Sequence, residues 1–454
     1  MSDKVLAYLK ENRESMIDKL MKFLSIPSVS TDSKHKEDVV KAGNFLTDYL
    51  KEIGFQSVEL HKTNGHPLVY GEWLEAKGAH TVLLYGHYDV QPADPFELWE
   101  SDPFTPEIRN ERLYARGASD DKGQIFMHLA VFEAYMKTEG RLPINVKICI
   151  EGEEEIGSKH LYEVLQEKKE VYKADFAMIS DSGMVEKGQP TILYGLKGFT
   201  GLELTVTGPN RDLHSGIYGG AVKNPAMALS HMISSMKNEA EQVMVSGFYD
   251  GIEELSNDER RLMNESPGED YPSTTDIDEV TPEKGYTAKE HTMARPTLEI
   301  NGMYSGYQGE GTKTIIPSTA TAKITCRLVP GQEPDRIQQL IADHLYKVAP
   351  AGVKVNVKPE PLSAKAYKMD PDHELLQKAA QSFSNAFGKE TVFVRLGGSI
   401  PVVEMIDELF DIPVVLLGFG TPEDNLHSPN ESFPLESFDK GMEVLVNYLQ
   451  SVAD

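Results

Sequence analysis

The feature of this sequence that most constrains its fold is a set of short apolar segments that run directly into histidine or acidic residues. The first, at 82–85, continues as Gly86-His87-Tyr88-Asp89-Val90. Residues two apart share one face of a strand, so His87 and Asp89 can leave the strand end pointing the same way. Imidazole is the commonest metal ligand, and a metal-bound histidine usually donates its other ring N–H to a carboxylate that fixes its tautomer. On its own the motif fits a strand-end histidine followed by a turn aspartate better than it fits a metal site, so the decision rests on the motifs that follow it.

Further acidic and histidine residues follow other apolar segments along the chain. The stretches 144–150, 176–179 and 412–417 are typical of buried strands, and a helix is predicted over 125–135, directly after the loop 117–123. In open α/β sheets, binding sites form beyond the carboxyl ends of the strands. We therefore expect the residues at these ends to meet at one edge of a sheet. They are His87, Asp120, Glu155, Asp181 and His427.

These five residues offer more ligands than one ion needs. Two imidazoles and three carboxylates exceed the four ligands of a tetrahedral zinc, but they suit two metals about 3.5–4 Å apart that share a carboxylate. One glutamate of the run 153–155 would then remain as a general base. Taken singly, the loop 117–123 also fits a helix cap, because Ser and Asp are common N-cap residues. The acidic run likewise fits a solvated loop.

The order of these motifs is similar to that of a known family. GHYDVQP, GASDDKG, EGEEEIGS, SDSG and LHSPNE follow one another along the chain, and the stretches 212–220 and 294–302 match as well. Together they resemble the M20 family of metallopeptidases, and within it the dipeptidase branch that includes cytosolic dipeptidases and carnosinases. The resemblance spans nearly the whole sequence, so it implies a fold and a function as well as a site.

The resemblance implies a role for each of the five candidate ligands. His87 and Asp181 would bind one zinc ion. Glu155 and His427 would bind a second zinc ion, and Asp120 would bridge the two. The family also tends to have a cis peptide after its bridging aspartate, which costs about 3 kcal/mol outside proline.

Two more residues beside the metals receive roles from the resemblance. Asp89 would orient His87, and Glu154 would be the base that activates the bridging water. Because three glutamates are adjacent, Glu154 is chosen by counting back from the Gly157-Ser158 pair of the family pattern.

Other residues are expected to contact the substrate. His214 lies in a Gly-flanked loop, and in related dimers the equivalent histidine crosses to the partner subunit and helps to hold the tetrahedral oxyanion. A loop histidine bonded to its own turn is the alternative. Arg327, on the predicted strand 322–328, suits the terminal carboxylate of a peptide, because a guanidinium can form two parallel bonds to it. By chemistry alone a solvated strand arginine is equally compatible. The resemblance favours substrate binding, and it adds Thr314, Gly398 and Ser399.

Composition narrows the class of protein. A chain of 454 residues exceeds one ordinary core, so two or three domains are expected. Its 45 basic and 71 acidic residues give a net charge of −26, which disfavours nucleic acid and anionic membranes as partners. Two cysteines do not suggest a disulfide framework, and the sequence contains no signal-peptide core or membrane-length apolar run. A soluble cytoplasmic protein is therefore expected.

The rhythm of predicted elements changes near residue 198. Strands and helices alternate before it, which favours an α/β fold with a mostly parallel sheet flanked by helices. After it the order is β-α-β-β-α-β, the ferredoxin-like signature. We expect 1–197 and 363–454 to form a zinc-peptidase-type catalytic domain, with 198–362 inserted as an α+β lid that makes a homodimer. An acidic surface excursion is expected at 240–295.

The sequence thus predicts a metal-dependent dipeptidase that acts on small peptides with a free C-terminal carboxylate. It would use a water that bridges two Zn²⁺ ions per subunit, with Mn²⁺ or Co²⁺ as alternatives. An N-acyl amino acid deacylase or desuccinylase on the same scaffold is the nearest rival, and a metal-containing binding protein without catalysis is another. The excursion and the ARPTLEING stretch favour the dipeptidase, and Glu154 beside a full ligand set disfavours loss of catalysis.

Overall fold

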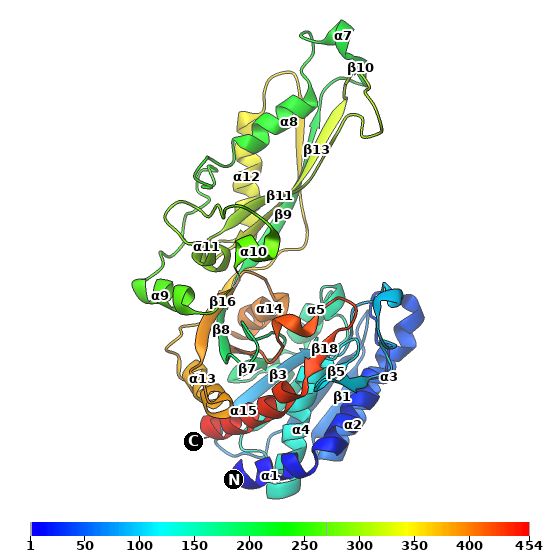
Figure 1. Cartoon of the computed structure of the whole chain (residues 1–454), viewed down its shortest axis with the longest axis vertical. Coiled ribbons are helices and arrows are strands. Elements are labelled where there is room, and N and C mark those ends of the chain that lie inside the picture. The colour runs from blue at the N-terminus through cyan, green and yellow to red at the C-terminus, as the bar shows by residue number, and fades with distance from the viewer. Residues whose placement is uncertain (1, 269, 454) are drawn as a thin grey trace. The chain divides into compact units, whose positions relative to one another are not determined.

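The computed structural model describes residues 2–268 and 270–453. Two compact units are evident in the chain (Figure 1). Unit 1 consists of the described residues of 1–194, 369–394 and 405–454, and unit 2 consists of those of 195–368 and 395–404. Unit 2 is therefore inserted into the sequence of unit 1.

Unit 1 is organised around a large sheet. Counted over the described residues, it has nine strands in the order β1-β2-β6-β3-β7-β17-β8-β15, with β16 also paired to β8. Their bounds are β1 Gln56–His61, β2 Leu68–Trp73, β3 Thr81–His87, β6 Asn145–Glu151, β7 Phe176–Ile179, β8 Thr191–Leu196, β15 Tyr367–Lys368, β16 Val392–Leu396 and β17 Val414–Leu417.

The centre of this sheet is parallel. β3 pairs in parallel with β6 and β7, and β7 pairs in parallel with β17. These four strands are buried along almost their whole length, as parallel strands covered on both faces usually are. Antiparallel strands complete both edges. The predicted α/β class with a largely parallel central sheet is confirmed.

Helices surround this sheet. They are α1 Ser2–Glu11, α2 Arg13–Leu24, α3 Lys36–Ile53, α4 Lys122–Glu139, α5 Leu161–Glu167, α6 Lys169–Tyr172, α13 Glu374–Phe387, α14 Pro401–Phe410 and α15 Leu435–Ala453. α4 is buried at every residue from 122 to 135, because α1, α2, α3 and α15 all pack against it. Figure 1 shows α15 and α4 near the two chain ends. α3 ends at Gly54 with φ of 105°, the left-handed stop that glycine accepts most readily.

Short elements complete unit 1. A three-stranded sheet has the order β18-β5-β4, formed by Ser432–Pro434, Arg112–Tyr114 and Glu107–Arg109. The 3₁₀ helices are η1 Ser33–His35, η2 Phe96–Leu98, η3 Glu154–Ile156 and η4 Pro422–Asp424. η3 directly follows β6 and carries two of the three adjacent glutamates.

Unit 2 is built on a four-stranded antiparallel sheet in the order β11-β13-β9-β14. These strands are β9 Gly198–Thr207, β11 Thr297–Ser305, β13 Thr319–Leu328 and β14 Lys354–Pro359. α8 (Pro225–Ser234) and α12 (Pro334–Val348) pack on it around an apolar core that includes Leu204, Met232 and Ile341. The predicted β-α-β-β-α-β order is confirmed.

Two further features of unit 2 lie outside this core. β10 (Leu213–His214) and β12 (Ile315–Ile316) pair as a two-stranded antiparallel ribbon. The short helix α7 (Ser215–Tyr218) directly follows β10 in the chain. The predicted excursion contains α9 (Asn257–Glu265), α10 (Tyr271–Thr275) and α11 (Ala288–Ala294).

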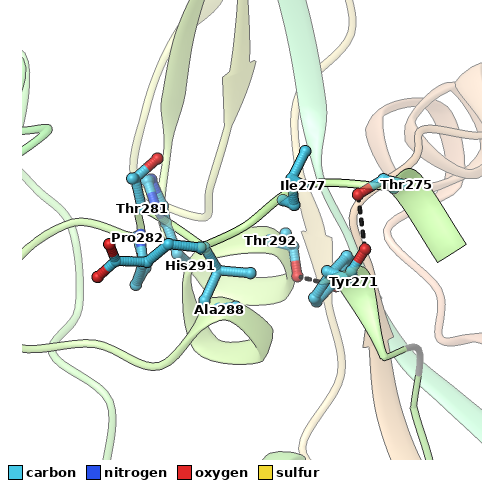
Figure 2. Close-up of a pocket in the computed structure, with 10 residues that line it drawn as sticks. Tyr271, Thr275, Ile277, Thr281, Pro282, Ala288, His291 and Thr292 are labelled. Carbon is cyan, nitrogen blue, oxygen red and sulfur yellow. Dashed lines mark hydrogen bonds between the residues drawn. The ribbon is translucent and has the colours of Figure 1, made fainter. Parts of the chain in front are cut away.

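A cavity of about 230 Å³ lies among α10, α11 and residues 277–282 (Figure 2). Apolar side chains such as Ile277 and Pro282 line it together with His291. It is smaller than the ~300 Å³ at which ligand pockets usually begin. None of its lining residues is a predicted ligand or substrate contact.

Across 2–268 and 270–453, no helix combines the length and the apolar character that crossing a bilayer would require.

Candidate metal centre

The five predicted ligands meet at the carboxyl ends of the parallel strands of unit 1. His87 is the last residue of β3, Asp181 follows β7, and Glu155 lies in η3 after β6. Asp120 ends the loop before α4, and His427 lies beyond η4. The strands β6, β3, β7 and β17 are neighbours in the sheet, so their ends bring distant parts of the sequence together.

Asp120 lies between the two histidines. Its Oδ1 is 3.0 Å from Nε2 of His87, and its Oδ2 is 3.0 Å from Nε2 of His427. Asp181 Oδ2 is 3.8 Å from His87 Nε2, and Glu155 Oε2 is 3.4 Å from His427 Nε2. Each oxygen of Asp120 thus faces one histidine–carboxylate pair.

These residues form two groups that could each hold an ion. His87, Asp120 and Asp181 offer ligand atoms within 4.8 Å of one another, and so do Asp120, Glu155 and His427. The buried Nε2 atom of His87 lacks a partner with hydrogen-bond geometry, although two carboxylates are near it. An imidazole nitrogen surrounded by carboxylate oxygens is the donor set that zinc takes. The residues therefore fit a metal pair.

The electrostatics of the site support the same reading. Burial and the neighbouring Asp120 carboxylate raise the pKa of Asp181 to about 7 and the pKa of Glu155 to about 8. Burial would also raise the pKa of Asp120, but the His427 and His87 imidazoles hold it below its usual range. Interaction with Asp120 raises the pKa of His427 to about 9. Carboxylates packed this closely favour a cation among them.

His87 is held in the tautomer that a metal needs. Its Nδ1 lies 3.1 Å from the backbone oxygen of Asp89, which can only accept, so Nδ1 carries a proton and Nε2 is the nitrogen left to bind a metal. The residue before it must be small, because a Cβ on Gly86 would lie 2.2 Å from Ile125 Cγ2 and 2.8 Å from Asp121 Oδ2. Asp121 Oδ2 accepts the backbone N–H of His87, which fixes the end of β3.

The Asp89 carboxylate also accepts hydrogen bonds from the backbone of the glutamate turn, which the sequence motif did not indicate. Its oxygens accept the backbone N–H groups of Glu154 at 3.2 Å and Glu155 at 3.1 Å, while Oδ1 lies 3.5 Å from His87 Nδ1. It therefore connects the end of β3 to the glutamate-bearing turn.

The three adjacent glutamates have different surroundings. Glu153 accepts from the backbone N–H of His66 and contacts His160 Nδ1 at 2.9 Å. Glu155 faces His427 and accepts from Gln91 Nε2 at 2.7 Å. Within the described residues the Glu154 carboxylate accepts no hydrogen bond.

The backbone is unusual at two ligands. The peptide between Asp120 and Asp121 is cis, as the resemblance implied. His427 has φ of 59°, a left-handed conformation that is uncommon for a residue other than glycine.

The predicted substrate contacts all lie in unit 2. The exposed Arg327 donates from Nη1 to Ser399 Oγ at 2.9 Å, beside Gly398. His214 is exposed, and its Nδ1 accepts from the Gly216 N–H at 3.0 Å, which is the turn bond weighed as the alternative. Thr314 is also exposed. It lies beside His214 because the Thr314 carbonyl accepts a hydrogen bond from the Ser215 N–H.

Sequence reasoning left three site residues without a role. They are Asp121, Gln91 and Glu431. All three stand within quoted motifs, yet their bonds reach residues far along the chain. Residue type and spacing therefore held no signal for them.

The match to known sequences covers most of the chain. Residues 83–451 match the family described as Peptidase family M20/M25/M40. The chain belongs to this family. The M20 resemblance of the motifs is therefore confirmed, and the protein is a peptidase of that family.

Individual M20 relatives are similar over nearly their full length. Cys-Gly metallodipeptidase dug1 of Schizosaccharomyces pombe is 31% identical, over 99% of this chain and 98% of that protein. Human Beta-Ala-His dipeptidase is 26% identical, over 99% of this chain and 92% of that protein. The solved structure of an M20 family metallo-carboxypeptidase from Sulfolobus solfataricus has a TM-score of 0.82 at 31% identity, covering 96% of this chain and 99% of that one.

Proposed function

We propose that this M20 peptidase is a metal-dependent dipeptidase, which hydrolyses dipeptides that have a free C-terminal carboxylate with a water held between two zinc ions. The observation that carries the proposal is the placement of Asp120, with one oxygen 3.0 Å from each of His87 Nε2 and His427 Nε2. A carboxylate placed in this way can serve two cations, as in other two-metal hydrolases.

The proposed ligand sets follow the two groups of side chains. His87 and Asp181 would hold one ion, Glu155 and His427 the other, and Asp120 both. When bound, such ions lower the pKa of a shared water and polarise the scissile carbonyl. Mn²⁺ and Co²⁺ accept the same ligands and are alternatives to zinc.

Glu154 is proposed as the group that takes the proton from the water and delivers it to the leaving amine. Its carboxylate is unengaged within the described residues, whereas Glu153 and Glu155 are both engaged. Burial raises the pKa of Glu154, which favours uptake of a proton from the water. Asp89 holds its backbone through the N–H of Glu154.

Unit 2 is proposed to bind the substrate and to form a homodimer. Arg327 has no acidic partner in the described part of the chain, so its guanidinium can donate to the C-terminal carboxylate of a peptide. Ser399, Gly398 and Thr314 are proposed as further substrate contacts. His214 would act from the partner subunit on the oxyanion. The bond from Gly216 N–H to Nδ1 leaves Nε2–H as a donor, as this role requires.

We also propose a cytoplasmic location. Cys149 and Cys326 are both free and buried, which suits a reducing compartment.

Most of the relatives described above are named dipeptidases, but one is named a carboxypeptidase, which is a rival function for this chain. The fungal and human proteins are named dipeptidases, whereas the Sulfolobus protein is named a carboxypeptidase. An N-acyl amino acid deacylase or desuccinylase is a further alternative on the same scaffold.

A substrate panel tests the proposal. Metal-stripped protein is reloaded with Zn²⁺, Mn²⁺ or Co²⁺ and given dipeptides, their C-terminal amides, longer peptides and N-acyl amino acids. A dipeptidase should cleave dipeptides with a free C-terminal carboxylate and should not cleave their C-terminal amides. Preference for longer peptides would identify a carboxypeptidase, and preference for N-acyl amino acids a deacylase. Absence of metal-dependent hydrolysis across the panel would refute the proposal.

A further inference from the structure

Glu431 is a fully buried carboxylate four residues after His427 that has no assigned role. It accepts a hydrogen bond from Arg116 Nη1 at 2.7 Å. It also accepts three backbone N–H groups, from Gly117 at 2.9 Å, Ser119 at 3.0 Å and Asp120 at 3.1 Å. A carboxylate that accepts three backbone N–H groups from within four residues in this way fixes the path of the loop.

The loop held by Glu431 ends at the ligand shared by both metal groups. Its Oε1 accepts from Ser119 and Asp120, and its Oε2 accepts from Gly117 and Arg116. Because the Asp120 N–H is one of these donors, the direction in which the Asp120 side chain leaves the backbone depends on Glu431. The Arg116 guanidinium, 1% exposed, balances the buried charge.

We infer that Glu431 is a positioning residue for Asp120, which holds the loop so that each Asp120 oxygen reaches one of the two histidine-containing ligand groups. The inference rests on the proposed two-metal function. Partners of metal ligands typically change metal affinity about 10- to 100-fold. Because Asp120 belongs to both ligand groups, the loss of Glu431 weakens the binding of both ions.

A competing role is distinguishable. Glu431 and His427 lie on one short segment, so Glu431 could instead fix only His427, which would affect one ion. The nearby Asp424 does not substitute for Glu431, because it binds side chains, those of Ser119 and Arg112, and no backbone N–H of the loop 117–120.

The test uses Glu431→Gln in the full chain. Metal-stripped protein is titrated with Zn²⁺ against a chelator of known affinity, which yields two stepwise dissociation constants without any activity measurement. We expect both constants to rise about 10- to 100-fold. Glu133→Gln is the matched control. Glu133 is also a buried carboxylate, but it accepts hydrogen bonds from Tyr49 and Lys19, which are not among the proposed metal-binding residues. Its two constants should equal those of the wild type.

Glu431→Asp keeps the charge but shortens the side chain by one methylene, so it serves if Glu431→Gln does not fold in circular dichroism. The same rise in both constants is expected from it. A rise in only one of the two dissociation constants, or in neither, would overturn the inference. If the wild type binds two ions but cleaves no member of the substrate panel, the dipeptidase proposal fails while this metal-binding result still decides the role of Glu431.

Discussion

Glu154→Gln tests the chemistry most directly. The substitution keeps the volume of the side chain and removes its ability to accept a proton. The backbone of Glu154 is held by Asp89 Oδ1, 3.2 Å from its N–H, and this bond survives the change. Because the carboxylate accepts no hydrogen bond within the described residues, the substitution removes no hydrogen bond from the site.

The expected effect is large and confined to turnover. General base catalysis contributes about 100- to 10,000-fold, which corresponds to about 2.7–5.4 kcal/mol of activation free energy at about 1.36 kcal/mol per tenfold. We expect kcat for the best dipeptide to fall by that factor with KM little changed. Metal analysis by mass spectrometry should still find two ions per subunit, since Glu154 lies outside both ligand groups.

Glu153→Gln is the matched control. Its carboxylate is engaged with the His66 N–H and with His160, so its loss should lower stability more than kcat. Near-normal turnover in Glu154→Gln, or loss of its metals, would refute the assignment. A larger loss of kcat in Glu153→Gln would move the base to that residue.

Three further predictions concern Asp120, His214 and Lys197. Asp120→Ala should abolish activity and weaken both ions, because Asp120 belongs to both groups; two tightly held ions after dialysis would exclude a bridge. If His214 acts in trans, mixing inactive His214→Ala and Glu154→Ala subunits should restore part of the activity; no recovery after verified exchange, or a monomer in solution, would exclude that role. Burial and repulsion from Arg327 lower the pKa of Lys197 to about 7 from 10.5, so the unfolded chain binds an extra proton between those values. The wild type should therefore gain stability as pH rises from about 7 to 10.5, by up to about 1.4 kcal/mol per pH unit, and Lys197→Met should lose that gain in urea denaturation at pH 6, 8 and 10.

Much of the candidate metal site was predictable because its proposed ligands are tied to local patterns. His87 and Asp181 directly follow apolar runs, and the carboxyl ends of parallel strands must share one edge of the sheet. Asp120 was predictable for a similar reason, since its loop directly precedes a helix. The chemistry of two imidazoles and three carboxylates then pointed to two ions.

The choice among adjacent glutamates was not a local matter. Residue type does not distinguish Glu153 from Glu154, and only the resemblance to a family selected one of them. In the folded chain, His66 and His160 engage Glu153, and Asp89 holds the backbone of Glu154. These partners come from other elements, so spacing within the run could not reveal them.

The sequence by itself determined the α/β class and the inserted antiparallel unit, because apolar periodicity is a property of short segments. It also predicted the candidate ligands, from residue chemistry together with the family resemblance. Only the tertiary structure decided that Glu431 holds the loop of Asp120, 311 residues away, and that Asp89 anchors the glutamate turn. Hydrogen bonds of this kind join buried groups whose proximity is set by the packing of whole elements. A buried carboxylate has to find donors, but the fold selects which ones.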